Sequence, residues 1–139
     1  MKTSLSAALA LTLLAAPAFA SGDAAKGEAD FKKCKACHMI VADDGTEIQK
    51  GGKTGPNLYG LIGKTIASEE GFKYGDGILA LNAKGMVWDE ELIAEYISDP
   101  AKFLKEQTGD DAAKTKMTFK LGKGQEDMAA YLATLKPAE

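Results

Sequence analysis

The stretch Cys34-Lys35-Ala36-Cys37-His38 contains both cysteines and the only histidine of this 139-residue chain. Its C-x-x-C-H spacing is the one at which a c-type haem is attached. Each thiol can add across one haem vinyl group to form a thioether, and the histidine that follows can reach the iron from one side. The stretch therefore predicts one covalent haem per chain, tethered by Cys34 and Cys37 and ligated by His38.

Paired cysteines also occur in zinc sites and in redox-active dithiols. Zinc would need four ligands, and the sequence has no second pair of cysteine or histidine residues. A redox dithiol would follow a strand in a βαβ pattern, whereas residues 22–33 have the spacing of an amphipathic helix. A thiol oxidoreductase remains an alternative hypothesis, which requires that Cys34 and Cys37 be free.

The first 20 residues have the composition of a secretory signal peptide. An apolar Ala/Leu-rich run from Leu5 to Ala16 is followed by a small-x-small end, Ala18-Phe19-Ala20. The apolar run is shorter than the roughly 20 residues that a membrane-spanning helix needs. We expect residues 1–20 to be cleaved off after Ala20, the chain to be exported to the periplasm before haem is attached, and residues 21–139 to form a single domain.

The charges of the chain are unevenly distributed. Without residues 1–20 the chain has 16 lysines, no arginine and 20 acidic residues, a net charge of about −4, which does not favour nucleic-acid binding. The segment from Asp89 to Asp99 has five acidic residues and no lysine. Lysines gather instead near the haem motif and in residues 101–124, as Lys33, Lys35, Lys102, Lys105, Lys114, Lys116, Lys120 and Lys123.

Hydrophobic periodicity predicts an all-α fold. The predicted helices are residues 22–33, 76–84, 89–99 and 125–135. Asp23 and Asp89 are the predicted N-caps of the first and third helices, and Pro100 is predicted to end the third. Residues 39–53 and 101–124 show no sustained period and are predicted to be connections, and no strand pattern appears.

The second axial position of the iron must be filled by a methionine or stay open, because the chain has no other histidine. Met39 adjoins His38 and cannot swing to the far face of the haem. Met128 lies on the apolar face of a predicted helix and Met86 precedes another, and at such positions methionine usually serves packing. Met117 lies in a polar loop with no helical face to serve. We therefore predict His/Met ligation through Met117, with an open position as the alternative.

Several landmarks follow the haem motif in a fixed order. They are Thr54-Gly55-Pro56-Asn57-Leu58, then Trp88, Tyr96 and Asp99-Pro100, then Thr115-Lys116-Met117-Thr118-Phe119. With this order the chain resembles the class I cytochromes c over essentially all of residues 21–139, and its longer connections make it most similar to the periplasmic cytochrome c2 branch of purple bacteria. The resemblance implies a small all-α fold wrapped around one haem, with the first and last helices crossing.

The resemblance also implies roles for residues around the haem. The carbonyl of Pro56 would accept a hydrogen bond from the far nitrogen of His38. Tyr74 and Trp88 would reach the haem propionates. Lys64 occupies a position where the family often has an arginine near a propionate, and lysine lacks the bidentate fork of arginine.

Two further contacts are implied. Tyr96 would point its hydroxyl at the sulfur of Met117. The crossing of the terminal helices would bring Gly27 and Phe31 against Met128 and Tyr131.

A haem with both axial positions filled can exchange electrons but has no open site for oxygen or substrate. We therefore expect an electron-transfer protein and not an enzyme. The resemblance implies a soluble monomer that takes electrons from a quinol-oxidising cytochrome bc1 complex and passes them to a terminal oxidase or a photosynthetic reaction centre, docking through lysines near the haem edge. A ligand-binding or peroxidatic haem protein is the alternative if Met117 does not bind the iron.

Overall fold

Within residues 22–136 the chain forms five α-helices, one 3-10 turn and one small hairpin. The computed structural model describes residues 22–136, so the predicted signal peptide, residues 1–20, lies outside the described range. The elements are, in chain order, α1 (Ala24–Asp30), the 3-10 turn η1 (Phe31–Lys33), β1 (Ile40–Val41), β2 (Glu47–Gln49), α2 (Asp76–Ala83), α3 (Glu90–Ser98), α4 (Pro100–Thr108) and α5 (Gln125–Ala133). None of the helices within residues 22–136 is long and apolar enough to cross a membrane.

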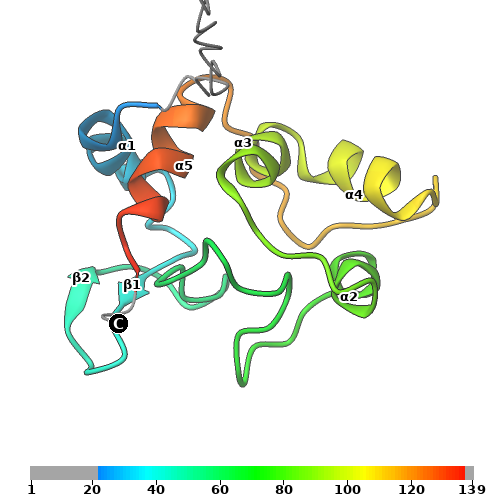
Figure 1. Ribbon diagram of the computed structural model, residues 1–139, viewed down its shortest axis with the longest axis horizontal. Helices are drawn as coiled ribbons and strands as arrows, with labels where there is room; N and C mark the ends of the chain where they lie inside the picture. The colour runs from blue at the N-terminus through cyan, green and yellow to red at the C-terminus, as the bar shows by residue number, and fades with distance from the viewer. Residues whose placement is uncertain (1–21, 137–139) are drawn as a thin grey trace, which may run out of the picture.

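The first and last helices, α1 and α5, lie side by side (Figure 1). Their backbones approach closely at Gly27, where a Cβ atom would overlap the carbonyl of Asp127 and lie 2.7 Å from the Cβ of Tyr131. Phe31, which is fully buried, meets Tyr131 edge to face with ring centroids 6.1 Å apart. The predicted contact of Gly27 and Phe31 with Tyr131 is thus confirmed.

The predicted helix starts are also confirmed. The carboxylate of Asp23 accepts hydrogen bonds from the first backbone N–H groups of α1, and that of Asp89 accepts one from the N–H of Leu92 at 2.8 Å. Each satisfies a donor that the helix itself leaves without a partner. At the end of α2 the chain turns through Gly85, whose φ of 68° is a left-handed conformation that favours glycine.

Helix α4 was not predicted, because it lies within the segment 101–124 that lacks a sustained period. Pro100 is its first residue and does not end α3, since the fixed φ of proline suits the first turn of a helix. Asp99 is the N-cap. Its buried residues Pro100, Phe103 and Leu104 have helical spacing, but a proline at the first of these positions also fits the end of the preceding helix.

The strands β1 and β2 correct the prediction that residues 39–53 contain no regular structure. They pair antiparallel, Ile40 with Gln49 and Val41 with Glu47, with an irregularity between the two pairs. A hairpin this short is marginal by itself. The side chain of Asn57 supports it by accepting a hydrogen bond from the N–H of Val41 at 3.0 Å and donating one to its carbonyl at 2.8 Å. The fold remains one of helices and loops, as predicted.

The close approach at Gly27 predicts a large effect on stability. Gly27→Ala places a methyl group where the α5 backbone lies, and overpacking of this kind typically costs about 1–3 kcal/mol. We expect the free energy of unfolding, measured with guanidinium chloride, to fall by about that amount. Gly122→Ala is the matched control, because its Cβ position is open and its φ is not left-handed. Equal stabilities of the two variants would contradict the tight crossing.

Candidate haem site

A single cavity collects the predicted haem residues. Its volume of about 340 Å³ falls within the range of roughly 300–1,000 Å³ typical of cofactor sites. Its lining includes all eight predicted residues, Cys34, Cys37, His38, Pro56, Tyr74, Trp88, Tyr96 and Met117. Apolar side chains such as Leu58, Leu61, Ile78, Ile93, Ile97 and Leu132 supply much of the remaining wall. A largely apolar cavity with a few polar groups suits a flat, largely apolar ring with a few polar substituents.

His38 is held in one orientation by a hydrogen bond to the loop at Pro56. Its Nδ1 lies 2.9 Å from the carbonyl oxygen of Pro56. A carbonyl only accepts hydrogen bonds, so Nδ1 carries the proton and Nε2 keeps the lone pair that a metal ion can bind. Burial lowers the pKa of His38, while the hydrogen bond with Pro56 opposes this shift. The neutral ring is the form that ligates metals.

The backbone turn of the motif places the three reactive side chains on one wall. The N–H groups of Cys37 and His38 both donate to the carbonyl of Cys34, at 3.1 and 2.9 Å. Gly55 then passes directly over the imidazole of His38, where a Cβ atom would overlap the ring. Position 55 therefore requires a glycine, because a side chain there would collide with the imidazole of His38.

The environment of Cys34 does not suit a redox-active thiol. Burial raises the pKa of Cys34 to about 11. Reactive cysteines need the thiolate and have lowered pKa values. A thioether carries no charge, so the same burial does not penalise it.

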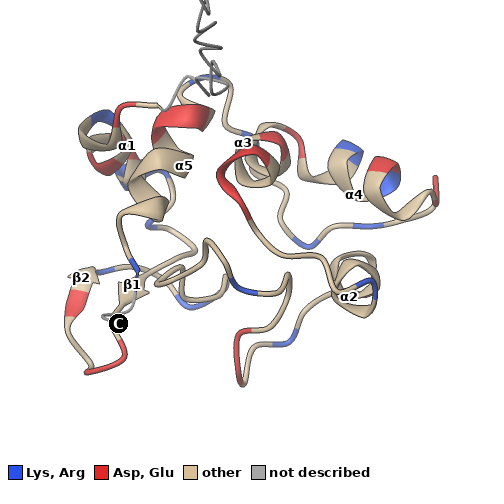
Figure 2. Ribbon diagram, in the orientation of Figure 1, with Lys and Arg blue, Asp and Glu red and all other residues tan. Residues whose placement is uncertain are grey.

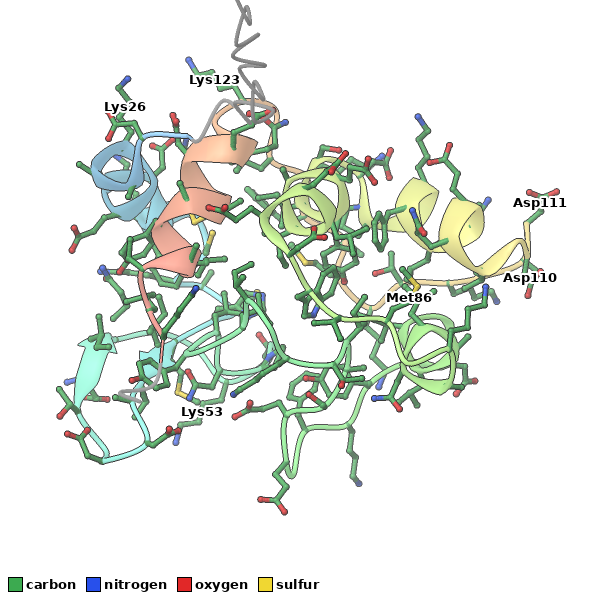
Figure 3. The ribbon with its side chains drawn as sticks, in the orientation of Figure 1. Lys26, Lys53, Met86, Asp110, Asp111 and Lys123 are labelled. Carbon is green, nitrogen blue, oxygen red and sulfur yellow. The ribbon has the colours of Figure 1, made fainter. Side chains whose placement is uncertain are left out.

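Two of the four candidate methionines, Met117 and Met128, line the cavity. Met128 belongs to α5 and is 2% exposed, packed into the core between the helices. Met86 lies beside α2 and α4 (Figure 3) and, like Met39, is not among the cavity residues. Met117 is fixed by Thr115, whose hydroxyl oxygen accepts from its N–H at 3.0 Å and whose hydroxyl donates to its carbonyl at 3.1 Å.

Tyr74 and Trp88, two aromatic residues that line the cavity, each carry a polar group. The hydroxyl oxygen of Tyr74 accepts the N–H of Glu69 at 3.2 Å, so its own proton is not used in that bond. Trp88 is 4% exposed and packs against Tyr96 and Phe103 at centroid distances of 5.3 and 6.0 Å. The hydroxyl of Tyr74 and the indole N–H of Trp88 are both groups that donate to carboxylates.

Tyr96 lies next to the loop that carries Met117. Burial raises the pKa of Tyr96, and a hydrogen bond with the side chain of Thr115 opposes this shift. Tyr96, Thr115 and Met117 all line the cavity, and the contact of the Tyr96 hydroxyl with the Met117 sulfur stays a prediction.

Lys64 does not face the cavity. Its ammonium lies 3.1 Å from the carbonyl oxygen of Tyr59 and 3.3 Å from a carboxylate oxygen of Glu69. It is not among the described residues that line the cavity. Sequence reasoning missed this arrangement, because it depends on a partner that only the folded loop brings near.

The lysines of the predicted ring differ in their surroundings. Lys33, Lys114 and Lys116 line the cavity. Lys120 is paired with Asp99 at 2.6 Å, and Lys123 projects beside the start of α5 (Figure 3). Figure 2 shows acidic residues at the starts of α3 and α5, and lysines along the connection between α4 and α5.

Comparison with known proteins agrees with the site. No protein-family profile matches the chain. Cytochrome c-550 of Paracoccus versutus is 63% identical over 140 residues, which cover 99% of this chain and 91% of the relative. Cytochrome c2 of Rhodobacter capsulatus is 62% identical over 136 residues, 97% of this chain and 98% of the relative. The solved structure of that cytochrome c2 has a TM-score of 0.80 and covers 81% of this chain and 97% of its own.

A helical fold around a C-x-x-C-H cavity, with neighbours at these identities, defines a class I c-type cytochrome. Within this class the chain belongs to the family of cytochromes c2 and c-550. It is an electron-transfer protein and not an enzyme, and it carries one covalent haem c. Cys34 and Cys37 are the only cysteines in the sequence.

The contact of Gly55 with His38 predicts a site-specific loss of stability. Gly55→Ala sets a methyl group against the imidazole, so either the ring or the backbone must move, at a cost of about 1–3 kcal/mol. We expect a lower unfolding midpoint of the haem-loaded protein in guanidinium chloride together with a changed visible spectrum. Gly122→Ala should alter neither. An unchanged spectrum in Gly55→Ala would contradict the proposed tight packing on His38.

Proposed function

We propose that this chain carries single electrons between membrane redox complexes of the periplasm, through an iron ligated by His38 and Met117. One observation supports this most directly: the cavity is lined both by the C-x-x-C-H motif, with a free lone pair on His38 Nε2, and by Met117. With both His38 and Met117 holding the iron, no position would be left for oxygen or substrate. The haem, when bound, supplies one-electron exchange.

Each residue of the site has a part in this proposal. Cys34 and Cys37 tether the group, and the carbonyl of Pro56 holds the ring of His38 and raises its basicity. The thioether of Met117 favours ferrous iron, and the apolar walls disfavour the additional charge of ferric iron, so the reduction potential is high. Tyr74 and Trp88 would hold the propionate carboxylates of the haem, and the apolar residues of the lining would exclude water.

The family and the charge layout support further parts of the proposal. Residues 1–20 act as a signal peptide that is cleaved after Ala20, and residues 21–139 act as a monomeric domain in the periplasm. The electron donor is a cytochrome bc1 complex and the acceptor is an oxidase or a photosynthetic reaction centre. Lysines at the cavity rim dock the carrier on these acidic partners, while the acidic start of α3 lies elsewhere on the surface (Figure 2).

Substitution of Met117 tests the ligation directly. Met117→Ala keeps both cysteines, so we expect covalent haem to remain and the reduction potential to fall by ~0.1 V or more, within the span of about 0.8 V over which axial ligands tune haem iron. The weak ferric sulfur-to-iron absorption near the red end of the spectrum should disappear.

Met128→Leu is the control, because Met128 also lines the cavity and the change conserves volume. It should leave the potential and the absorption nearly unchanged. If Met117→Ala behaves as the wild type does, or if the wild-type protein shows a high-spin spectrum, the iron has an open position and the ligand-binding alternative is favoured.

Salt dependence tests the docking surface. Electrostatic attraction at a lysine rim raises the rate of association, and screening removes it as the Debye length falls from about 10 Å at 0.1 M to about 3 Å at 1 M salt. We expect the second-order rate of electron transfer to an acidic redox partner to fall steeply over that range. Lys35→Glu and Lys114→Glu should slow it more than Lys84→Glu, whose lysine is bonded to the carbonyl of Gln107 at 2.7 Å. A rate that is flat with salt argues against docking through these lysines.

A further inference from the structure

A short strap, residues 64–69, forms part of the cavity wall. At one end the carbonyl of Lys64 accepts the N–H of Trp88 at 2.9 Å. In the middle, Ile66 is fully buried and its N–H donates to the carbonyl of Met86 at 2.8 Å. These bonds fix the strap against residues that flank or line the haem cavity.

Ala67 reverses the direction of the strap. It lines the cavity and has a φ of 56°, the only left-handed conformation of a residue other than glycine within residues 22–136. Such a conformation is unfavourable for a residue with a side chain and persists only where the surrounding contacts impose it. The turn at Ala67 brings Glu69 back to within 3.3 Å of the Lys64 ammonium.

The ion pair between Lys64 and Glu69 is partly shielded from solvent. The side chains are 37% and 28% exposed. The ammonium also donates to the carbonyl of Tyr59 at 3.1 Å, so two of its three N–H donors are used by residues that do not line the cavity. The neighbouring Glu70 is exposed and makes no ion pair within the described chain.

The position of this cation matters to the iron. Lysine carries one compact ammonium on a flexible stem, so it serves one set of acceptors at a time. Oxidation adds one positive charge in the cavity, and a cation that lies closer to that charge repels it more strongly. A lysine that is free to turn toward the cavity therefore disfavours the ferric state, whereas a lysine held outside disfavours it less.

We propose that Glu69 is a positioning residue, which holds the ammonium of Lys64 outside the haem cavity and thereby keeps the reduction potential lower than it would be with Lys64 released. This inference rests on the proposed electron-carrier function. It assigns a task to a carboxylate that neither touches the haem cavity nor belongs to the haem motif.

The test is a redox titration of the haem-loaded protein in a double-mutant cycle. Glu69→Gln removes the tether, and Glu70→Gln removes the same charge one residue further along without affecting an ion pair. We expect Glu69→Gln to raise the potential more than Glu70→Gln does. In the Lys64→Gln background this excess should disappear, because there is no cation left to release.

If Glu69 acts only through its own charge and does not hold Lys64, the potentials follow a different pattern. Glu69→Gln would then raise the reduction potential as much as Glu70→Gln does, or by the same amount with and without Lys64. Either result overturns the proposal. If Glu69→Gln does not accumulate with haem, Glu69→Asp replaces it, since this variant keeps the charge and shortens the arm by one methylene. A raised potential in Glu69→Asp supports the tether, and an unchanged potential overturns it.

The absorption assigned to methionine ligation keeps the two proposals separate. Its absence from the wild-type protein contradicts ligation by Met117. If that absorption is present and Glu69→Gln and Glu70→Gln raise the reduction potential equally, only the role of Glu69 is contradicted.

Discussion

The structure depends on one hydrogen bond, from Nδ1 of His38 to the carbonyl oxygen of Pro56. It joins the haem motif to the loop 18 residues further along and decides which ring nitrogen keeps its lone pair. Gly55 allows the loop to approach because it has no side chain, and Asn57 ties the same loop to the hairpin. Of these three consecutive residues, Gly55 lets the loop approach His38, Pro56 orients the imidazole, and Asn57 supports the hairpin. Their contacts explain why a segment with few regular elements is nevertheless well defined.

The local chemistry of the sequence was enough to predict much of this site. C-x-x-C-H is a spacing of five adjacent residues whose meaning does not depend on the fold. The caps Asp23 and Asp89 are also local, since an N-cap acts on N–H groups two or three residues away. Met117 could be singled out because a thioether in a polar loop lacks a packing role, and the structure places it on the cavity wall.

The parts that escaped prediction depend on contacts that the local pattern of the sequence does not reveal. The β hairpin has too few residues to show alternation and is supported by Asn57. Helix α4 buries Pro100, Phe103 and Leu104 at helical spacing, but Pro100 can begin a helix as well as follow one. The ammonium of Lys64 is engaged by Glu69 and by the backbone carbonyl of Tyr59, a pairing that the order of residues alone does not predict. In each case a contact made in the folded chain decided among conformations that the local sequence permits equally.

The crossing of α1 and α5 has a consequence for what a shortening of the chain at either end would do. The N–H of Asp23 donates to a carboxylate oxygen of Asp127 at 2.7 Å, a contact between residues 104 positions apart. Loss of α5 would leave the face of α1 around Gly27, and Phe31 after it, without the residues that cover them. The two ends of the described chain therefore stabilise each other, and a deletion at one end is felt at the other.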